Sequence, residues 1–206
     1  VHIRMMVTRG TKRSPSQDPR TSIYGPTIVI IAEYKAPRRQ GDEGLRLFTV
    51  HVRRGRPDVQ DPKLHPHSKL NCVISCIQAT KAGADEALML DPQGFVSTCN
   101  STNFFIVRKG EVWTSTGQYC LNGITRGNII ALCKRNGIPV FERDFSLFDV
   151  YSADEAFVTG TFGGVAYVQE VDGRVIGEGK IGPMTQRLRA LYAALLDEDC
   201  PPAPGE

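Results

Sequence analysis

The stretch Leu121-Asn122-Gly123-Ile124-Thr125-Arg126-Gly127 leads straight into an apolar segment, Ile129-Ile130-Ala131-Leu132-Cys133. A glycine-containing turn before such a run predicts a helix over residues 125–136 that begins at the end of the turn. The free backbone N–H groups and the dipole of a helix N-terminus favour an anion such as phosphate. On its own this motif is more typical of an ordinary capped turn, so its meaning depends on the rest of the chain.

Composition narrows the class of protein. Of the 206 residues, 41% are hydrophobic and 23% are charged, which is typical of a folded domain and too apolar for a disordered chain. The formal net charge is only +3, and the one basic cluster, Arg53-Arg54-Gly55-Arg56, suits a solvated face or a small anion better than nucleic acid. We see no apolar run of membrane-spanning length and no signal-peptide pattern, so we expect a cytoplasmic protein with neither a membrane nor a nucleic-acid partner.

The cysteines and histidines predict no metal site. The six cysteines form no CxxC pair, and we expect buried free thiols in a reducing compartment. His65 and His67 are too close together, and too poor in neighbouring ligands, for a convincing metal centre.

Residue patterns predict a mixed set of strands and helices. The hairpin spacing favours an antiparallel or mixed sheet, and the polar, proline-containing segments 11–26 and 53–68 are predicted loops. A chain that opens directly in a strand leads us to expect missing residues upstream. We predict helices at 69–82, 125–136, 146–149 and 183–197, and strands at 1–8, 27–34, 45–52, 86–91, 95–98, 103–107, 111–114, 140–144, 155–159, 166–171 and 174–176.

Several of these segments, taken together and in order, carry a family resemblance: Ala84–Asp91, Gly94 with Asn103–Val107, Leu121–Arg126, Ala153–Thr161 and Asp172–Gly177. They resemble the fold-type-IV pyridoxal-phosphate enzymes, the class IV aminotransferases that act on branched-chain or D-amino acids. The opening Val7–Thr11 is most similar to the D-amino-acid and R-amine branch.

The resemblance implies an α/β (α+β) large domain with a mixed sheet and flanking helices, preceded by a smaller domain. On this basis we expect residues 1–54 to be a remnant of the small N-terminal domain and 55–68 to be an interdomain loop. Residues 69–199 would form the large domain that binds pyridoxal phosphate, and 200–206 a tail.

The resemblance also implies the cofactor pyridoxal 5'-phosphate and a lysine that bonds to it and moves a substrate proton. Lys69 is the candidate, although its spacing to Asn71 is one residue shorter than in D-amino-acid members; Lys63 is the alternative. The cofactor phosphate would lie on backbone and hydroxyl groups of two loops, with glycines permitting close approach. These cofactor-binding positions are Leu121, Gly123, Ile124, Thr125, Gly160 and Thr161.

Two positions depart from the family pattern. Thr98 occupies the position of a glutamate that pairs with the pyridine nitrogen, and Cys72 that of a tyrosine near the cofactor's phenolic oxygen. A neutral threonine cannot stabilise a protonated ring as a carboxylate does, so we hypothesise an unprotonated ring with a weaker capacity to accept electrons. Cys72 donates only weakly, and it is equally typical of a core position.

The resemblance implies transfer of an amino group between an amino acid or amine and a 2-oxo acid, by a homodimer. Arg9 and Arg13 are candidates for binding the substrate carboxylate, since a guanidinium pairs with it in bidentate fashion; the alternative is that they are surface residues. Two other functions remain open. One is a lyase resembling aminodeoxychorismate lyase, and the other is a non-catalytic relative.

Overall fold

The computed structural model describes residues 1–34 and 43–201. The chain divides into two compact units, 1–38 and 39–206, which are considered separately. In the first, β1 (His2–Thr8) and β2 (Thr27–Glu33) form an antiparallel hairpin in which Met5 lies opposite Ile30 and Val7 opposite Ile28. These four apolar side chains share one face of the hairpin and are exposed. The loop between the strands contains a short 3-10 helix, η1 (Pro19–Thr21), which the Asp18 carboxylate caps.

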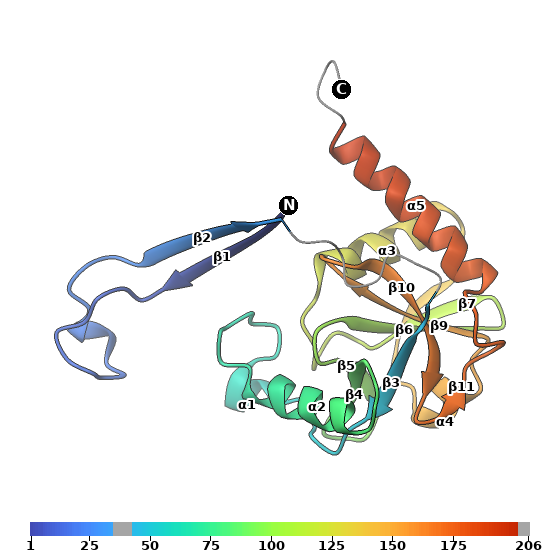
Figure 1. Ribbon diagram of the computed structural model, residues 1–206, viewed down its shortest axis with the longest axis horizontal. Coiled ribbons are helices and arrows are strands. Elements are labelled where there is room, and N and C mark those ends of the chain that lie inside the picture. Colours follow the sequence, from blue (N-terminus) through green and yellow to red (C-terminus); the bar gives the residue numbers. More distant parts are fainter. Residues whose placement is uncertain (35–42, 202–206) are drawn as a thin grey trace. The chain divides into compact units, whose positions relative to one another are not determined.

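The second unit is built on a mixed sheet that has nine strands within the described residues (Figure 1). Their order is β5-β4-β3-β10-β9-β6-β7-β8, with β11 paired to β10. Strand β3 runs parallel to both of its neighbours, β4 and β10, and β7 runs parallel to β8. The other pairs are antiparallel. This agrees with the mixed sheet that the sequence predicts. The strands are β3 (Leu45–Thr49), β4 (Glu86–Leu90), β5 (Val96–Cys99), β6 (Asn103–Arg108), β7 (Glu111–Thr114), β8 (Val140–Glu142), β9 (Glu155–Gly160), β10 (Gly164–Val171) and β11 (Arg174–Val175).

Both faces of the central strands are buried, which explains the continuous apolar runs in the sequence. Along β6, Phe104 and Ile106 face a cluster that includes α4 (Leu147–Tyr151), whereas Phe105 and Val107 face α3 (Ile124–Arg135) and α5 (Pro183–Asp199). Helices α3 and α5 lie side by side on that second face (Figure 1). A third, smaller cluster lies beneath α2 (Leu70–Lys81). No helix among the described residues is long and apolar enough to cross a membrane.

The predicted elements are present, with shifted ends. The strand expected at 166–171 begins at Gly164, because its ladder with β9 extends to Gly160. The loop expected at 53–68 contains a one-turn helix, α1 (Pro57–Gln60), which begins with a proline, where the missing N–H costs no hydrogen bond. The strand expected at 45–52 is the shorter β3, and it lies inside the nine-stranded sheet. The domain boundaries themselves stay a prediction, and positions 202–206 of the expected tail lie outside the described residues.

The start of α5 is fixed to the sheet by one carboxylate. Glu155, which opens β9, accepts hydrogen bonds from the backbone N–H of Met184 at 2.9 Å and of Thr185 at 2.8 Å. Gly182 comes so close to this side chain that an added Cβ would lie 2.1 Å from the Glu155 Cδ. The carboxylate therefore supplies the cap that Gly182, at the N-cap, cannot supply itself.

We expect Glu155→Gln to lower the free energy of unfolding by about 1–3 kcal/mol, because an amide can accept from only one of the two N–H groups and opposes the other. Urea unfolding followed by circular dichroism measures this. Glu178→Gln, at an exposed position, is the matched control and should change stability by less than about 0.5 kcal/mol. Equal effects of the two substitutions would show that the Glu155 carboxylate does not hold α5.

Candidate cofactor site

The first wall of the site is the turn that leads into α3. Gly123 is the N-cap residue, in an extended conformation, and it offers no side chain to accept from the first N–H groups of the helix. Ile124 is 77% exposed at the start of the helix, whereas Thr125 is buried. A long helix that begins without a side-chain cap presents free N–H donors to an anion, and the dipole favours negative charge at the same place.

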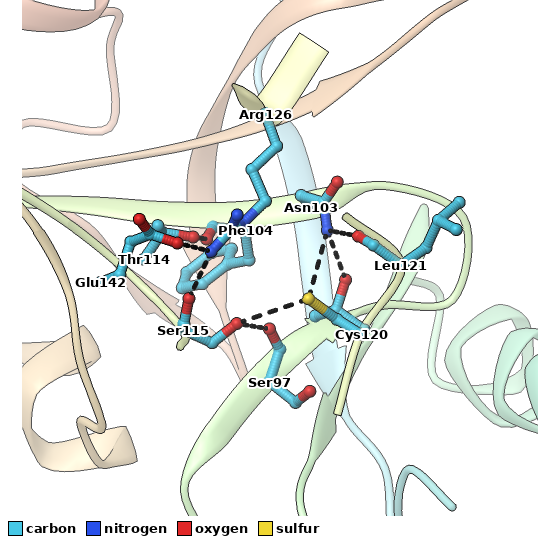
Figure 2. Close-up of polar contacts among 10 residues, drawn as sticks. Ser97, Asn103, Phe104, Thr114, Ser115, Cys120, Leu121, Arg126 and Glu142 are labelled. Atoms are coloured by element: carbon cyan, nitrogen blue, oxygen red, sulfur yellow. Dashed lines mark hydrogen bonds and ion pairs between the residues drawn. The ribbon is translucent and has the colours of Figure 1, made fainter. Parts of the chain in front are cut away.

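Asn103, the first residue of β6, holds this turn against the sheet (Figure 2). Its amide nitrogen donates to the Leu121 carbonyl at 2.9 Å and lies 3.7 Å from the Cys120 sulfur. On the other side of the amide, a Cβ added to Gly123 would lie 2.5 Å from the Asn103 Oδ1. Glycine at 123 is therefore required by the packing of the turn on Asn103, as well as permitting the approach of a ligand.

The second wall is the end of β9. Thr159 pairs with Asn103 across the β6–β9 ladder, so Gly160 follows at the level where β6 begins. A Cβ added to Gly160 would lie 3.3 Å from the Thr102 methyl group. Thr161 is exposed beyond it, and the buried Thr159 hydroxyl has no hydrogen-bond partner within the described part of the chain. The two loops predicted to bind phosphate thus converge on Thr102 and Asn103.

A third group of residues surrounds the start of α2. Lys69 is the N-cap residue of this helix and Cys72 lies in its first turn. The Arg54 guanidinium donates to the Cys72 sulfur at 3.2 Å and to the Tyr119 carbonyl at 3.1 Å. Burial of the amine lowers the pKa of Lys69; the neighbouring Cys72 opposes this shift and the positive charge of Arg54 adds to it. Although the Lys69 residue as a whole is exposed, its amine is therefore in a partly desolvated environment.

Thr98 lies on β5 and is buried. Its hydroxyl donates to the Thr102 carbonyl at 2.7 Å, and the Asn103 amide nitrogen lies 3.4 Å from the same hydroxyl oxygen. A threonine hydroxyl has a single proton, and here that proton is used within the chain. Thr98 can therefore accept a hydrogen bond from a ligand but can donate one only by giving up its bond to Thr102.

Arg126 points away from the turn that precedes it. Its guanidinium is buried and donates to the Ser115 carbonyl at 2.7 Å and to the Glu142 carboxylate at 2.8 Å (Figure 2). The positive charge of Arg126 is thus neutralised within the fold, where it joins α3 to β8. The anion-binding capacity of the turn consequently rests on N–H groups and hydroxyls.

The model for the family described as amino-transferase class IV matches residues 1–171. The chain belongs to this family. It is 42% identical, over 98% of its length, to "Branched-chain-amino-acid aminotransferase-like protein 2" of Arabidopsis thaliana, and 43% identical, over 93%, to a putative branched-chain-amino-acid aminotransferase of Methanocaldococcus jannaschii. The crystal structure of the Escherichia coli branched-chain amino acid aminotransferase matches with a TM-score of 0.89 and 27% identity over 98% of the chain. These matches confirm the predicted class IV aminotransferase fold.

The chain spans only part of each of these relatives. It covers 36% of the Arabidopsis protein, 66% of the Methanocaldococcus protein and 68% of the solved Escherichia coli chain. The residues that bind cofactor and substrate in this class IV chain therefore remain predictions.

The structure brings most of the predicted positions into two groups. One group surrounds Thr102 and Asn103 and contains Thr98, Leu121, Gly123, Ile124, Thr125, Gly160 and Thr161. The other group surrounds Arg54 and contains Lys69 and Cys72. Arg9 and Arg13 belong to the other unit, where the Arg9 guanidinium donates to the Gln17 carbonyl and Arg13 is exposed. Their role in substrate binding stays a prediction.

Sequence reasoning missed the role of Asn103, and it named Arg54 only as part of a basic cluster, without its contact to Cys72. Asn103 carries a signal in retrospect, because it is a buried polar residue at the head of an apolar strand, where its amide must find partners. Arg54 carries no such signal, since its neighbours in the sequence are also basic and its contacts come from residues 18 and 65 positions away.

Gly123→Ala should lower the free energy of unfolding by about 1–3 kcal/mol, because the new methyl group would overlap the Asn103 amide and force the turn to move. Gly127→Ala is the matched control in the same helix. Nothing lies within 4 Å of a Cβ at 127, so alanine should raise stability by about 0.5–1 kcal/mol. Chemical denaturation of both variants measures the difference, and a neutral Gly123→Ala would contradict the packing described above.

Proposed function

We propose that this chain binds pyridoxal 5'-phosphate, with the phosphate on the N-terminus of α3. The observation that carries the proposal is the uncapped start of this helix, placed by Asn103 beside the end of β9. N–H groups of Ile124 and Thr125 and the Thr125 hydroxyl would hold the phosphate from one side, and Gly160 and Thr161 from the other. The groups that would contact the phosphate are hydroxyls and peptide N–H groups, and the glycines allow the backbone to approach closely. Such donors fit a phosphate dianion.

Lys69 would act at the other end of the cofactor. When bound, the cofactor supplies an aldehyde and an electron-accepting ring. The Lys69 Nζ would bond to it and carry a proton to and from the substrate carbon; a lowered pKa leaves more of this amine neutral near physiological pH, as both tasks require. Cys72, held by Arg54, would lie near the same end.

On this basis we propose an aminotransferase that moves an amino group between an amino acid, D- or branched-chain, or an amine and a 2-oxo acid. Arg9 and Arg13 would bind the substrate carboxylate, and a cytoplasmic homodimer would be the working form. A lyase resembling aminodeoxychorismate lyase would use the same cofactor and lysine. The two reactions differ in their products, because a lyase releases pyruvate without an amino acceptor.

One observation favours the other alternative to an aminotransferase, which is a non-catalytic relative. The Thr98 proton is committed to the Thr102 carbonyl, so the residue proposed to face the ring nitrogen would bring neither a charge nor a free donor. The ring would lack the partner that keeps it protonated, and its capacity to accept electrons would be lower. Such a chain would still bind the cofactor phosphate, but amino transfer would be slow or absent because the ring accepts electrons less well.

The decisive test is attachment of the cofactor. Added pyridoxal phosphate should give the visible absorbance band of a lysine-bound cofactor, and borohydride followed by peptide mapping should find the cofactor on Lys69. Lys69→Ala should abolish the adduct, whereas Lys63→Ala, the control at the alternative lysine, should not. An adduct on Lys63 would move the site; no band and no adduct, on this chain and on a longer one, would refute cofactor binding. Bound cofactor with neither amino transfer nor release of pyruvate would identify the non-catalytic relative.

The pH dependence of attachment gives a second test. The lysine reacts only as the neutral amine, and its pKa is lowered, chiefly by burial, so the neutral form prevails at a lower pH than for an exposed lysine. The attachment rate should therefore rise with pH and level off at a lower pH than the same reaction of Nα-acetyl-lysine. Stopped-flow absorbance measures both, and coinciding profiles would show that Lys69 is not desolvated.

A further inference from the structure

Tyr192 of α5 lies behind the phosphate end of the site. The residue is only 9% exposed, and its phenolic oxygen lies 3.4 Å from the Thr125 hydroxyl oxygen. Its ring also lies beside Gly164, the first residue of β10, since a Cβ added to Gly164 would be 3.6 Å from a ring carbon. Tyr192 thus lies beside Thr125 on one side of the proposed phosphate position and beside Gly164, the strand partner of Gly160, on the other.

The Tyr192 hydroxyl bears on the direction in which the Thr125 hydroxyl proton points. Thr125 has a single donor, and it can donate either to Tyr192 or to a ligand anion, but not to both. If the Tyr192 hydroxyl donates into the Thr125 oxygen, the Thr125 proton is directed towards the ligand. A distance of 3.4 Å is long for a bond between two hydroxyls, so we expect the effect to be modest.

We propose that Tyr192 is a positioning residue for the cofactor phosphate: its hydroxyl orients the Thr125 hydroxyl towards the anion, and its ring supports Gly164 at the start of β10. This inference rests on the proposed cofactor binding and adds to it a residue from the C-terminal helix, which lies beyond the part of the chain that the family model matches. The prediction is specific, because only ligands that carry the phosphate should depend on the Tyr192 hydroxyl.

Tyr192→Phe removes that hydroxyl and keeps the ring against Gly164. We expect it to weaken binding of pyridoxal phosphate about two- to tenfold and to leave binding of pyridoxal, which lacks the phosphate, unchanged. Equilibrium titrations by absorbance measure both ligands, and their ratio is independent of the fraction of folded protein. In a Thr125→Val background the same substitution should have no further effect, because the hydroxyl that it orients is gone.

Tyr151→Phe is the matched control, since it removes a phenol that donates to Asp172 at 2.7 Å in another part of the fold. It should leave the ratio of the two affinities unchanged. Equal weakening of both ligands by Tyr192→Phe, no weakening of either, or an undiminished effect in the Thr125→Val background would overturn the inference while cofactor binding stands. If the unaltered chain bound neither ligand, both proposals would fail together.

Discussion

The proposed phosphate end of the site depends on one buried amide. Asn103 opens β6, pairs with Thr159 across the ladder and donates to the Leu121 carbonyl, so it ties the turn before α3 to the middle of the sheet. A buried amide that loses a partner costs more than the bond itself contributes, and the turn is therefore specified strongly. The position of the α3 N-terminus, and of every donor on it, follows from this contact.

Much of the fold could be predicted because its strands are buried on both faces and are separated by glycine-containing turns. The run at 103–107 shows this directly. The pairing of the strands in the sheet was harder to predict. The segment at 45–52 reads as a strand, but nothing in its own residues indicates that it lies between β4 and β10, because parallel partners are far apart in sequence.

The candidate site shows the same division. The residues proposed to hold the phosphate follow from a sequence pattern that is local, a turn running into a helix, and the resemblance supplied the second loop. The bonds from Arg54 to Cys72 and from Thr98 to Thr102 were not predictable. Each depends on where a side chain points after the sheet has formed, and a hydroxyl or guanidinium has several possible partners until then.

The fold constrains the residues at the two ends of the proposed site differently. This difference determines which residues are evidence for a ligand and which are explained by folding alone. Gly123 is required by Asn103 whether or not a ligand binds, so its presence is explained by folding alone. The uncapped start of α3 is not explained in this way, because a serine or aspartate at an N-cap satisfies the same N–H groups without a ligand. At the other end, the Thr98 hydroxyl on β5 is used within the fold, whereas Lys69 is an exposed residue at the beginning of a helix that it does not cap with its side chain. Anion binding is thus supported by a feature that folding leaves unsatisfied, whereas at the other end only Lys69 is a residue whose identity the fold does not explain.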